Sequence, residues 1–595
     1  MAPVRRLRQL VARGHLPAAL CLALAGCATA PAAPGNGSPA DVVVDQLGYL
    51  PGAAKWAAVR AASRPATTFA LRDEASGAVV LRGALTPPRE WSAAGQSWQL
   101  ADFSALRAPG RYRLQVDGQA ESVPFVVDTQ VYAGLNAAAI KAYYFNRAGI
   151  ELESEYAGPY ARAAGHPDDH VLVHASAAGP GRPEGSVISS PKGWYDAGDY
   201  NKYIVNSAIS VCTLLAAYEQ FPEFFRHQDL RIPESGNGLP DLLDEVMWNL
   251  DWMLTMQDPA DGGVYHKLTN KRFDGMVMPE RATTERYVVQ KTTAATLDFA
   301  ASMSMASRIM RAFESRRPGL SARMLQAAQR AWAWAGAHPS EVYRQPPDIS
   351  TGEYADRRLD DEFAWAAAEL YISTRDDRYW SLVARDDAPL RVPAWWDVRT
   401  LGWISLAQHR DELTPAADRA LIERQVLGLG DRLSAQWTAS PFKLAMQDGD
   451  FIWASNAVAL NQAFVLLQAY RLSHRRPLLD AAQSALDYVL GRNPLGQSYV
   501  TGFGARVPMH PHHRPSEADG VAAPVPGFMV AGPNPGQDDR RHCAVPYPSA
   551  LPALSYLDAT CAYASNEVAI NWNAPLVYVS AALHELTPEP GQGAP

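Results

Sequence analysis

The sequence predicts a small β-sandwich followed by a much larger all-α domain. Between residues 41 and 128, apolar and polar residues alternate in short runs, the period of strands with one buried face. From residue 131 to 587 the apolar residues recur with helical spacing instead. The composition agrees, because 47% of the 595 residues are hydrophobic and only 19% are charged, which is enough to bury a large core.

The strand pattern of the first domain is clearest at residues 111–116, with the sequence Arg-Tyr-Arg-Leu-Gln-Val. Segments 69–71 and 79–81 indicate two strands joined by a turn at Gly77, and segment 123–127 closes the unit. About 90 residues of this kind suit a small β-sandwich.

Twelve segments of the second domain are predicted to be helices. They are 132–147, 203–220, 241–257, 292–313, 322–335, 361–374, 379–385, 398–408, 416–433, 455–473, 477–490 and 574–586. Several are apolar nearly all round, which implies burial between neighbouring helices. Six helical hairpins closed into a barrel fit this pattern. A bundle or a solenoid would show the same periodicity, although the absence of an internal sequence repeat weakens the solenoid.

The N-terminal residues 1–27 have the order of a bacterial lipoprotein signal peptide: basic residues, an apolar run at 16–25 too short to span a bilayer, then small residues. Residues 24–27, Leu-Ala-Gly-Cys, resemble a lipobox, in which Cys27 is lipidated; an ordinary signal with a chance cysteine is the alternative. Residues 28–40 are expected to be a linker and 588–595 a disordered tail. We therefore expect export across the inner membrane and a lipid anchor in the cell envelope, at the outer membrane or the cell surface.

Charge and cysteine content limit the partners and the covalent links. The net charge is −8 and no basic block lies beyond the N-terminus, so nucleic acid is not an expected partner. Outside the signal and lipobox only Cys212, Cys543 and Cys561 remain, so at most one disulfide can form. The sequence leaves open whether Cys543 pairs with Cys561. A monomer is expected.

A loop at residues 193–203, Gly-Trp-Tyr-Asp-Ala-Gly-Asp-Tyr-Asn-Lys-Tyr, carries the carboxylates Asp196 and Asp199 just before a predicted helix. Such a pair is more often an Asx turn, a helix cap or a calcium ligand than a catalytic base. Its aromatic neighbours slightly favour a sugar-binding site.

A second loop, residues 498–514, ends with three histidines among prolines. Pro508, Pro511 and Pro515 exclude the helix that would place two of these histidines on one face for a metal. We therefore expect His512 and Arg514 to donate hydrogen bonds to a polar ligand, with a plain surface loop as the alternative.

A third segment, residues 556–573, places Glu567 among apolar and aromatic residues. Such surroundings raise the pKa of a carboxyl group and would keep it protonated as a general acid. The alternative is a structural glutamate paired with Arg514.

Together these segments resemble the family 9 glycoside hydrolases, inverting cellulases with an (α/α)6 barrel. Residues 42–49, Val-Val-Val-Asp-Gln-Leu-Gly-Tyr, are similar to the start of the immunoglobulin-like domain that precedes the barrel in many members. Residues 232–238 and 240–245 also match the family, and the segments around His512 and Glu567 fit both of its signatures. The resemblance implies an immunoglobulin-like β-sandwich at 41–128 and an (α/α)6 barrel at 131–587.

The resemblance also implies roles for single residues. Asp199 would be the general base, Asp196 would help to hold the attacking water, and Glu567 would protonate the leaving oxygen. The residues expected to contact the sugar are His512, Arg514 and Asp558, with Trp453 and Trp572 as stacking surfaces. Inversion needs one ionised and one protonated carboxyl group, about 6.5–9.5 Å apart, so that a water fits between the base and the sugar.

Relatives with the immunoglobulin-like domain often bind zinc through cysteines in Arg-Cys-Gly and Ala-Cys-His contexts. Here the contexts are Arg-Ala-Gly at 147–149 and Ala-Gly-His at 164–166, so no zinc is expected. The family often binds calcium through an Asp-Glu pair that opens a helix, matched by Asp361 and Glu362, with Asp397 as a further ligand. The alternative is an acidic helix N-terminus stabilised by the macrodipole.

The expected function is therefore that of an inverting endo-β-1,4-glucanase, a cellulase that acts on cellulose or cello-oligosaccharides. An exo-acting β-glucosidase or glucosaminidase on oligosaccharides would keep the same chemistry. A surface glycan-binding lipoprotein without catalysis, or a helical barrel acting on another polysaccharide, are further alternatives.

Overall fold

The computed structural model describes residues 41–384 and 388–588. The predicted signal with Cys27, the predicted linker at 28–40 and all but the first residue of the predicted tail lie outside the described residues. Within the described ranges, no helix has both the length and the apolar character needed to cross a membrane.

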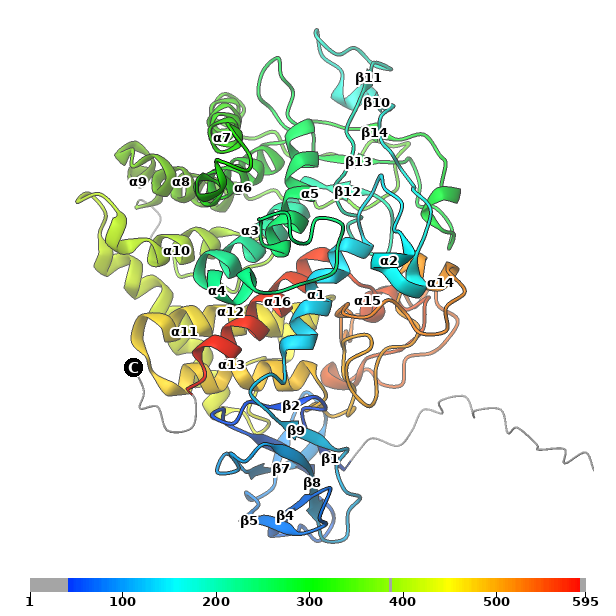
Figure 1. The fold of residues 1–595 in the computed structure, drawn as a ribbon, viewed down its shortest axis with the longest axis vertical. Helices are drawn as coiled ribbons and strands as arrows, with labels where there is room; N and C mark the ends of the chain where they lie inside the picture. Colours follow the sequence, from blue (N-terminus) through cyan, green and yellow to red (C-terminus); the bar gives the residue numbers. More distant parts are fainter. Residues whose placement is uncertain (1–40, 385–387, 589–595) are drawn as a thin grey trace, which may run out of the picture. The chain divides into compact units, whose positions relative to one another are not determined.

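The first domain consists of two β-sheets (Figure 1). One sheet has the order β1 (Val42–Val43), β3 (Trp56–Arg60), β7 (Gln96–Asp102) and β6 (Arg89–Trp91). The other has the order β2 (Gly48–Tyr49), β9 (Phe125–Val127), β8 (Gly110–Val116), β4 (Thr68–Asp73) and β5 (Val79–Ala84). Along β8, Tyr112, Leu114 and Val116 are buried in the core while the residues between them are not, so the predicted alternation is confirmed.

Six helices of the second domain form an inner ring. They are α3 (Ile204–Gln220), α6 (Thr293–Met310), α8 (Asp360–Thr374), α10 (Arg399–Gln408), α12 (Ser455–Ser473) and α16 (Ile570–Leu586). Each contacts the next in this order, and α16 returns to pack on α3, which closes the ring. Helix α3 is buried on all sides from Ile204 to Tyr218, as its sequence predicted.

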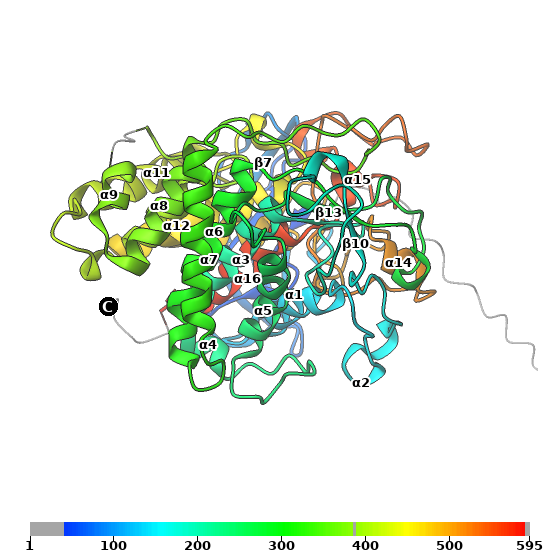
Figure 2. The same cartoon turned by 90° about the horizontal axis from the view of Figure 1, so that it is seen from above.

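Six further helices pack on the outside of this ring, and Figure 2 shows the domain from above. They are α1 (Ala133–Phe145), α5 (Asp241–Thr255), α7 (Leu320–Ala337), α9 (Asp377–Val383), α11 (Arg419–Ala439) and α13 (Arg476–Val489). These twelve helices are the twelve predicted ones. The largest differences are that α11 continues to Ala439 and that α16 starts before Pro575, which lies inside the helix.

Short helices lie in the loops between these twelve. The α-helical ones are α2 (Ser154–Ala157), α4 (Pro222–Arg226), α14 (Arg514–Ala518) and α15 (Tyr563–Asn566). The 3-10 turns are Gly158–Tyr160, Ala175–Ala177, Pro279–Arg281, Arg311–Phe313, Arg410–Glu412, Asp448–Asp450 and Pro552–Leu554.

The helical domain also contains a five-stranded sheet, which the sequence analysis did not predict. The sheet order is β11 (Val187–Ile188), β10 (Val171–Val173), β14 (Tyr287–Val288), β13 (Lys267–Thr269) and β12 (Lys202–Tyr203). Strands of two or three residues are too short for a period of two to be visible in the sequence. The sheet matters for the site because β12 begins three residues after Asp199.

The β-sandwich contacts the helical domain through a few specific residues. Trp91 of β6 stacks on Phe442, with ring centroids 4.4 Å apart. The Gln46 side chain accepts hydrogen bonds from the backbone N–H groups of Ala505 and Arg506 and donates one to the Gly496 carbonyl. The first domain therefore braces the loop that leads to His512.

Candidate active site

The Asp196–Asp199 turn is closed by a backbone hydrogen bond and packs tightly against the loop that contains His512. The Asp196 backbone N–H donates to the Asn201 carbonyl at 3.1 Å. A Cβ atom at Gly198 would lie only 2.2 Å from the backbone oxygen of His512, so this close approach requires glycine. The turn and the His512 segment are thereby fixed next to each other.

Asp196 is 2% exposed and both its carboxylate oxygens are hydrogen-bonded. Asn206 of α3 donates to Oδ1 at 2.6 Å, and the Tyr354 hydroxyl donates to Oδ2 at 2.7 Å. Burial, together with the charge of Asp199, raises the Asp196 pKa to about 8.

Asp199 is also buried, and the amide of Asn201 donates to its Oδ2 at 2.5 Å. Burial raises the Asp199 pKa above its ordinary value, while the positive charge of Arg514 and the hydrogen bonds from Asn201 oppose the rise. Asp199 therefore has cationic and hydrogen-bonding support for its ionised form.

Glu567 directly follows α15 and forms an isolated parallel β-bridge with His512. Burial raises its pKa well above the ordinary value, and the charges of Asp199 and Asp196 raise it further, against the opposing charge of Arg514. Carboxyl groups that influence one another in this way cannot all be ionised at neutral pH. The structure thus brings Glu567 close to Asp196 and Asp199, which precede it by more than 360 residues in sequence, and the three carboxyl groups interact electrostatically.

His512 and Arg514 both have hydrogen-bond partners within the protein. The His512 ring donates through Nδ1 to the Thr560 carbonyl at 2.6 Å. Burial lowers the His512 pKa to about 4, so the ring is neutral at pH 7. Its other nitrogen, Nε2, is therefore a hydrogen-bond acceptor. Arg514 is 6% exposed and donates to the carbonyls of Gly198 (2.7 Å) and Asp274 (3.0 Å). Arg514 thus braces the Asp196–Asp199 turn, which the sequence did not indicate.

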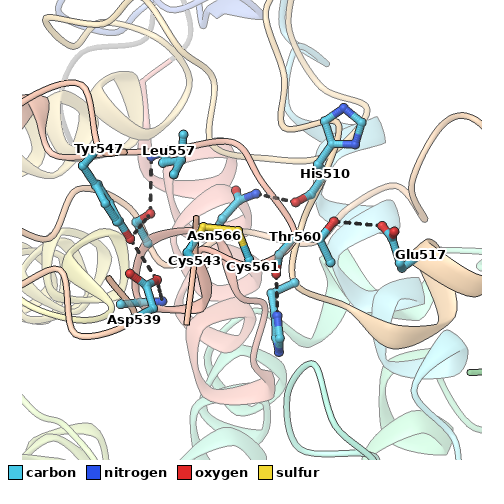
Figure 3. Close-up of a disulfide and its surroundings, with 12 residues drawn as sticks. His510, Glu517, Asp539, Cys543, Tyr547, Leu557, Thr560, Cys561 and Asn566 are labelled. Carbon is cyan, nitrogen blue, oxygen red and sulfur yellow. Dashed lines mark hydrogen bonds between the residues drawn. A yellow bond between two sulfur atoms is a disulfide. The ribbon is translucent and has the colours of Figure 1, made fainter. Parts of the chain in front are cut away.

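The carboxylate of Asp558 braces the loop of His512. It accepts hydrogen bonds from the backbone N–H groups of Met509 and His510, at 2.8 and 2.9 Å, and from the Asn566 amide at 3.0 Å. Figure 3 shows this region, in which Asn566 donates to the His510 carbonyl and Thr560 donates to Glu517.

A disulfide joins Cys543 to Cys561 in the same region, which answers the question that the sequence left open (Figure 3). Cys561 is the neighbour of Thr560, whose carbonyl holds the His512 ring. The remaining cysteine of the described residues, Cys212, is buried and free.

The two tryptophans expected to stack on sugars differ in exposure. Trp453 is 38% exposed and packs against Tyr563, with ring centroids 5.3 Å apart. Trp572 is only 8% exposed and belongs to the hydrophobic core, so it offers little ring surface to a sugar.

Tyr354 is a site residue that the sequence analysis missed. Besides its hydrogen bond to Asp196, its ring packs edge-on against Tyr203 and Trp395. Its backbone has φ +45°, a left-handed conformation that is strained for a bulky residue. Such a conformation has no sequence signal, because Tyr354 lies in an irregular segment between helices.

At the positions where relatives carry zinc-binding cysteines, this chain has Ala148 and Gly165. Ala148 packs in a small apolar cluster with Tyr195, and a Cβ at Gly165 would lie 2.5 Å from the Cβ of Pro279. His166 Nδ1 is 2.9 Å from the Tyr195 hydroxyl, and burial lowers the His166 pKa to about 3. An aromatic cluster therefore fills this position.

The carboxylates at the expected calcium position fit a cation only in part. The described residues contain no group of three His, Cys, Asp or Glu side chains that could hold a metal ion. Asp397 faces Arg358 at 3.6 Å, and Asp361 accepts from the Val398 N–H at 2.8 Å. However, both oxygens of Glu362 and of Asp298 are buried without a hydrogen-bond partner among the described residues.

Comparison with known proteins identifies the family of the chain. Residues 132–580 match glycosyl hydrolase family 9, and residues 38–121 match the cellulase N-terminal ig-like domain. The chain belongs to glycosyl hydrolase family 9. It is a glycoside hydrolase in which an immunoglobulin-like β-sandwich precedes the (α/α)6 barrel of this family.

Two curated relatives and one solved structure illustrate the similarity. A xyloglucan-specific endo-β-1,4-glucanase of Bacteroides ovatus is 44% identical over 92% of this chain and 94% of its own length. Endoglucanase D of Acetivibrio thermocellus is 32% identical over 90% of this chain and 82% of its own. A solved family 9 structure from Bacteroides ovatus has a TM-score of 0.86 at 42% identity and covers 92% of this chain and 99% of its own.

Proposed function

We propose that this family 9 enzyme is an inverting endo-β-1,4-glucanase in which Asp199 is the general base and Glu567 the general acid. The observation that carries the proposal is the convergence of the Asp196–Asp199 turn on Glu567. Burial raises the pKa of both groups, but that of Glu567 rises further: two neighbouring carboxylates add to the rise at Glu567, whereas the Arg514 charge and the Asn201 hydrogen bonds oppose it at Asp199.

In the proposed reaction a water molecule lies between Asp199 and the anomeric carbon of the sugar. Asp199 takes a proton from this water. At the same time the oxygen of the water bonds to the anomeric carbon, from the face opposite the leaving group. Glu567 gives its proton to the glycosidic oxygen as the bond to that oxygen breaks. Asp196 holds the water, and the product is the α-anomer.

We propose xyloglucan, a β-1,4-glucan with xylosyl branches, as the first substrate to test. The support is the 44% identity to the xyloglucan-specific relative from Bacteroides ovatus. Unbranched glucan is the other candidate, supported by the more distant endoglucanase. Initial rates on xyloglucan, carboxymethylcellulose and cellopentaose would decide. Early viscosity loss on a polymer indicates endo cleavage, whereas release of single sugars without viscosity loss would support an exo-acting enzyme.

We also propose that calcium binds near the start of α8. The partnerless carboxylates of Asp298 and Glu362 support this, because calcium accepts carboxylate oxygens together with backbone carbonyls and water. Bound calcium would offset the repulsion between these buried charges and stabilise α8 against α6. Chelation by EGTA should lower the Tm and added calcium should restore it; an unchanged Tm and no retained calcium would contradict the proposal.

For localisation we propose a monomer that is exported and lipid-anchored at Cys27, with membrane contact only through that anchor. The support is the lipobox-like sequence, which lies outside the described residues. A Cys27→Ser variant should lose incorporation of labelled fatty acid and leave the membrane fraction, and retention of both would contradict the anchor.

A further inference from the structure

Three charged residues outside the proposed catalytic set form a buried network beside the Asp196–Asp199 turn. Asp168 lies between two cations: Lys202 Nζ is 2.8 Å from its Oδ2 and Arg286 Nε is 3.0 Å from its Oδ1. Their exposed fractions are 5% for Asp168, 0% for Lys202 and 6% for Arg286. Burial raises the Asp168 pKa, but the two cations outweigh it and hold the pKa below the ordinary value.

The network holds both ends of the loop that carries the turn. At the start of the loop, the Ser190 N–H donates to the Asp168 carbonyl at 2.7 Å, and Lys202 Nζ donates to the Lys192 carbonyl at 2.6 Å. At its end, Lys202 is in β12, and Arg286 Nη1 donates to the carbonyl of Tyr200 at 2.8 Å. Tyr200 directly follows Asp199, so Arg286 fixes the backbone next to this carboxylate.

Stability alone is a poor explanation for this arrangement. Burying charges has a large desolvation cost, and a buried ion pair is often no more stabilising than an apolar substitute. Here one carboxylate faces two cations, so the network also carries a net positive charge in the interior. Arg286 is the member of the network that hydrogen-bonds the residue next to Asp199, and its charge opposes the rise in the Asp199 pKa.

We propose that Asp168, Lys202 and Arg286 are positioning residues for hydrolysis: they hold the loop of Asp196 and Asp199 in place, and Arg286 supplies positive charge toward Asp199. This rests on the proposed role of Asp199. The other charged or titratable groups that interact with Asp199 are Arg514 from the His512 loop, Lys267 from β13, Asp196, Tyr203 and Glu567.

The test replaces Arg286 with glutamine in the full-length enzyme. Asp168 keeps Lys202 as a partner in R286Q, so no buried carboxylate is left without a cation. Loss of the Arg286 charge should raise the Asp199 pKa and move the acidic limb of the kcat/KM–pH profile to higher pH by about half a unit or more. R286K keeps the charge, so its acidic limb should stay near that of the wild type even if kcat falls. K202Q keeps the Arg286 charge but loses the hydrogen bond to the Lys192 carbonyl, so its kcat should fall while its acidic limb stays near that of the wild type.

The matched control is Lys291→Gln. Lys291 also pairs with two aspartates, Asp258 and Asp261, but neither belongs to the loop of Asp199. K291Q should lower the Tm without moving the acidic limb. The inference is overturned if the acidic limb of R286Q coincides with that of the wild type, if R286K moves as far as R286Q, or if K202Q keeps the full kcat. If R286Q does not fold, the kcat of K202Q compared with that of K291Q decides, because only K202Q loosens the loop of Asp199. Failure of the wild type to hydrolyse any β-1,4-glucan would refute the proposed function instead.

Discussion

The disulfide between Cys543 and Cys561 should stabilise the protein and hold part of the site in place. Replacing both cysteines with alanine removes a link across 18 residues of sequence. A cross-link that closes a loop of this length lowers the entropy of the unfolded chain enough to contribute about 3 kcal/mol. In a chain of this size such a loss corresponds to a Tm decrease of at most a few degrees per kcal/mol.

The same link should affect catalysis, because Cys561 lies next to Thr560 and the Thr560 carbonyl accepts the hydrogen bond of the His512 ring. The double variant should therefore lose kcat/KM as well as Tm. Thermal unfolding and initial rates, each with and without dithiothreitol, measure both effects. Reductant should bring the wild type to the level of the variant and leave the variant unchanged. Equal Tm and kcat/KM in the oxidised wild type and the variant would refute this reasoning.

Three substitutions test the proposed catalytic groups. Glu567→Gln keeps the shape but removes the donated proton, so kcat should fall by about 10²–10⁴-fold with an unchanged Tm; full activity would exclude Glu567 as the acid. Asp196→Asn removes a charge that raises the Glu567 pKa, so the alkaline limb of the kcat–pH profile should move to lower pH, and a shift to higher pH would contradict the assignment. Tyr354→Phe deletes the donor to Asp196 and should lower kcat about tenfold or more while KM changes little, as measured by initial rates.

The long helices could be predicted from the sequence because their apolar faces repeat over several turns. Helix α12 begins and ends at the predicted residues, Ser455 and Ser473. The start of α16 could not be placed, since Pro575 suggests a first helical turn but lies inside the helix. The third sheet was missed because strands as short as β12 and β14 have no readable period and exist only through their tertiary partners.

In the site, too, some residues could be predicted from the sequence and others could not. The loops that carry Asp196, Asp199 and Glu567 were recognisable from residue types and from their resemblance to a family. The partners of those residues were not, because the hydrogen bonds of Tyr354 and Arg286 depend on the folding of distant segments onto the turn. The same limit applies to Arg514, whose hydrogen bonds to two backbone carbonyls have no signal in the sequence.

The anomeric form of the first product tests the central proposal most directly. Proton NMR during the first minutes of hydrolysis of a β-1,4-glucan oligosaccharide distinguishes the new reducing end before mutarotation. An Asp199 base and a Glu567 acid acting on opposite sides of the sugar predict that the α-anomer forms first and the β-anomer accumulates later. A β-anomer as the first product would show retention and would contradict the assignment of Asp199 as the base.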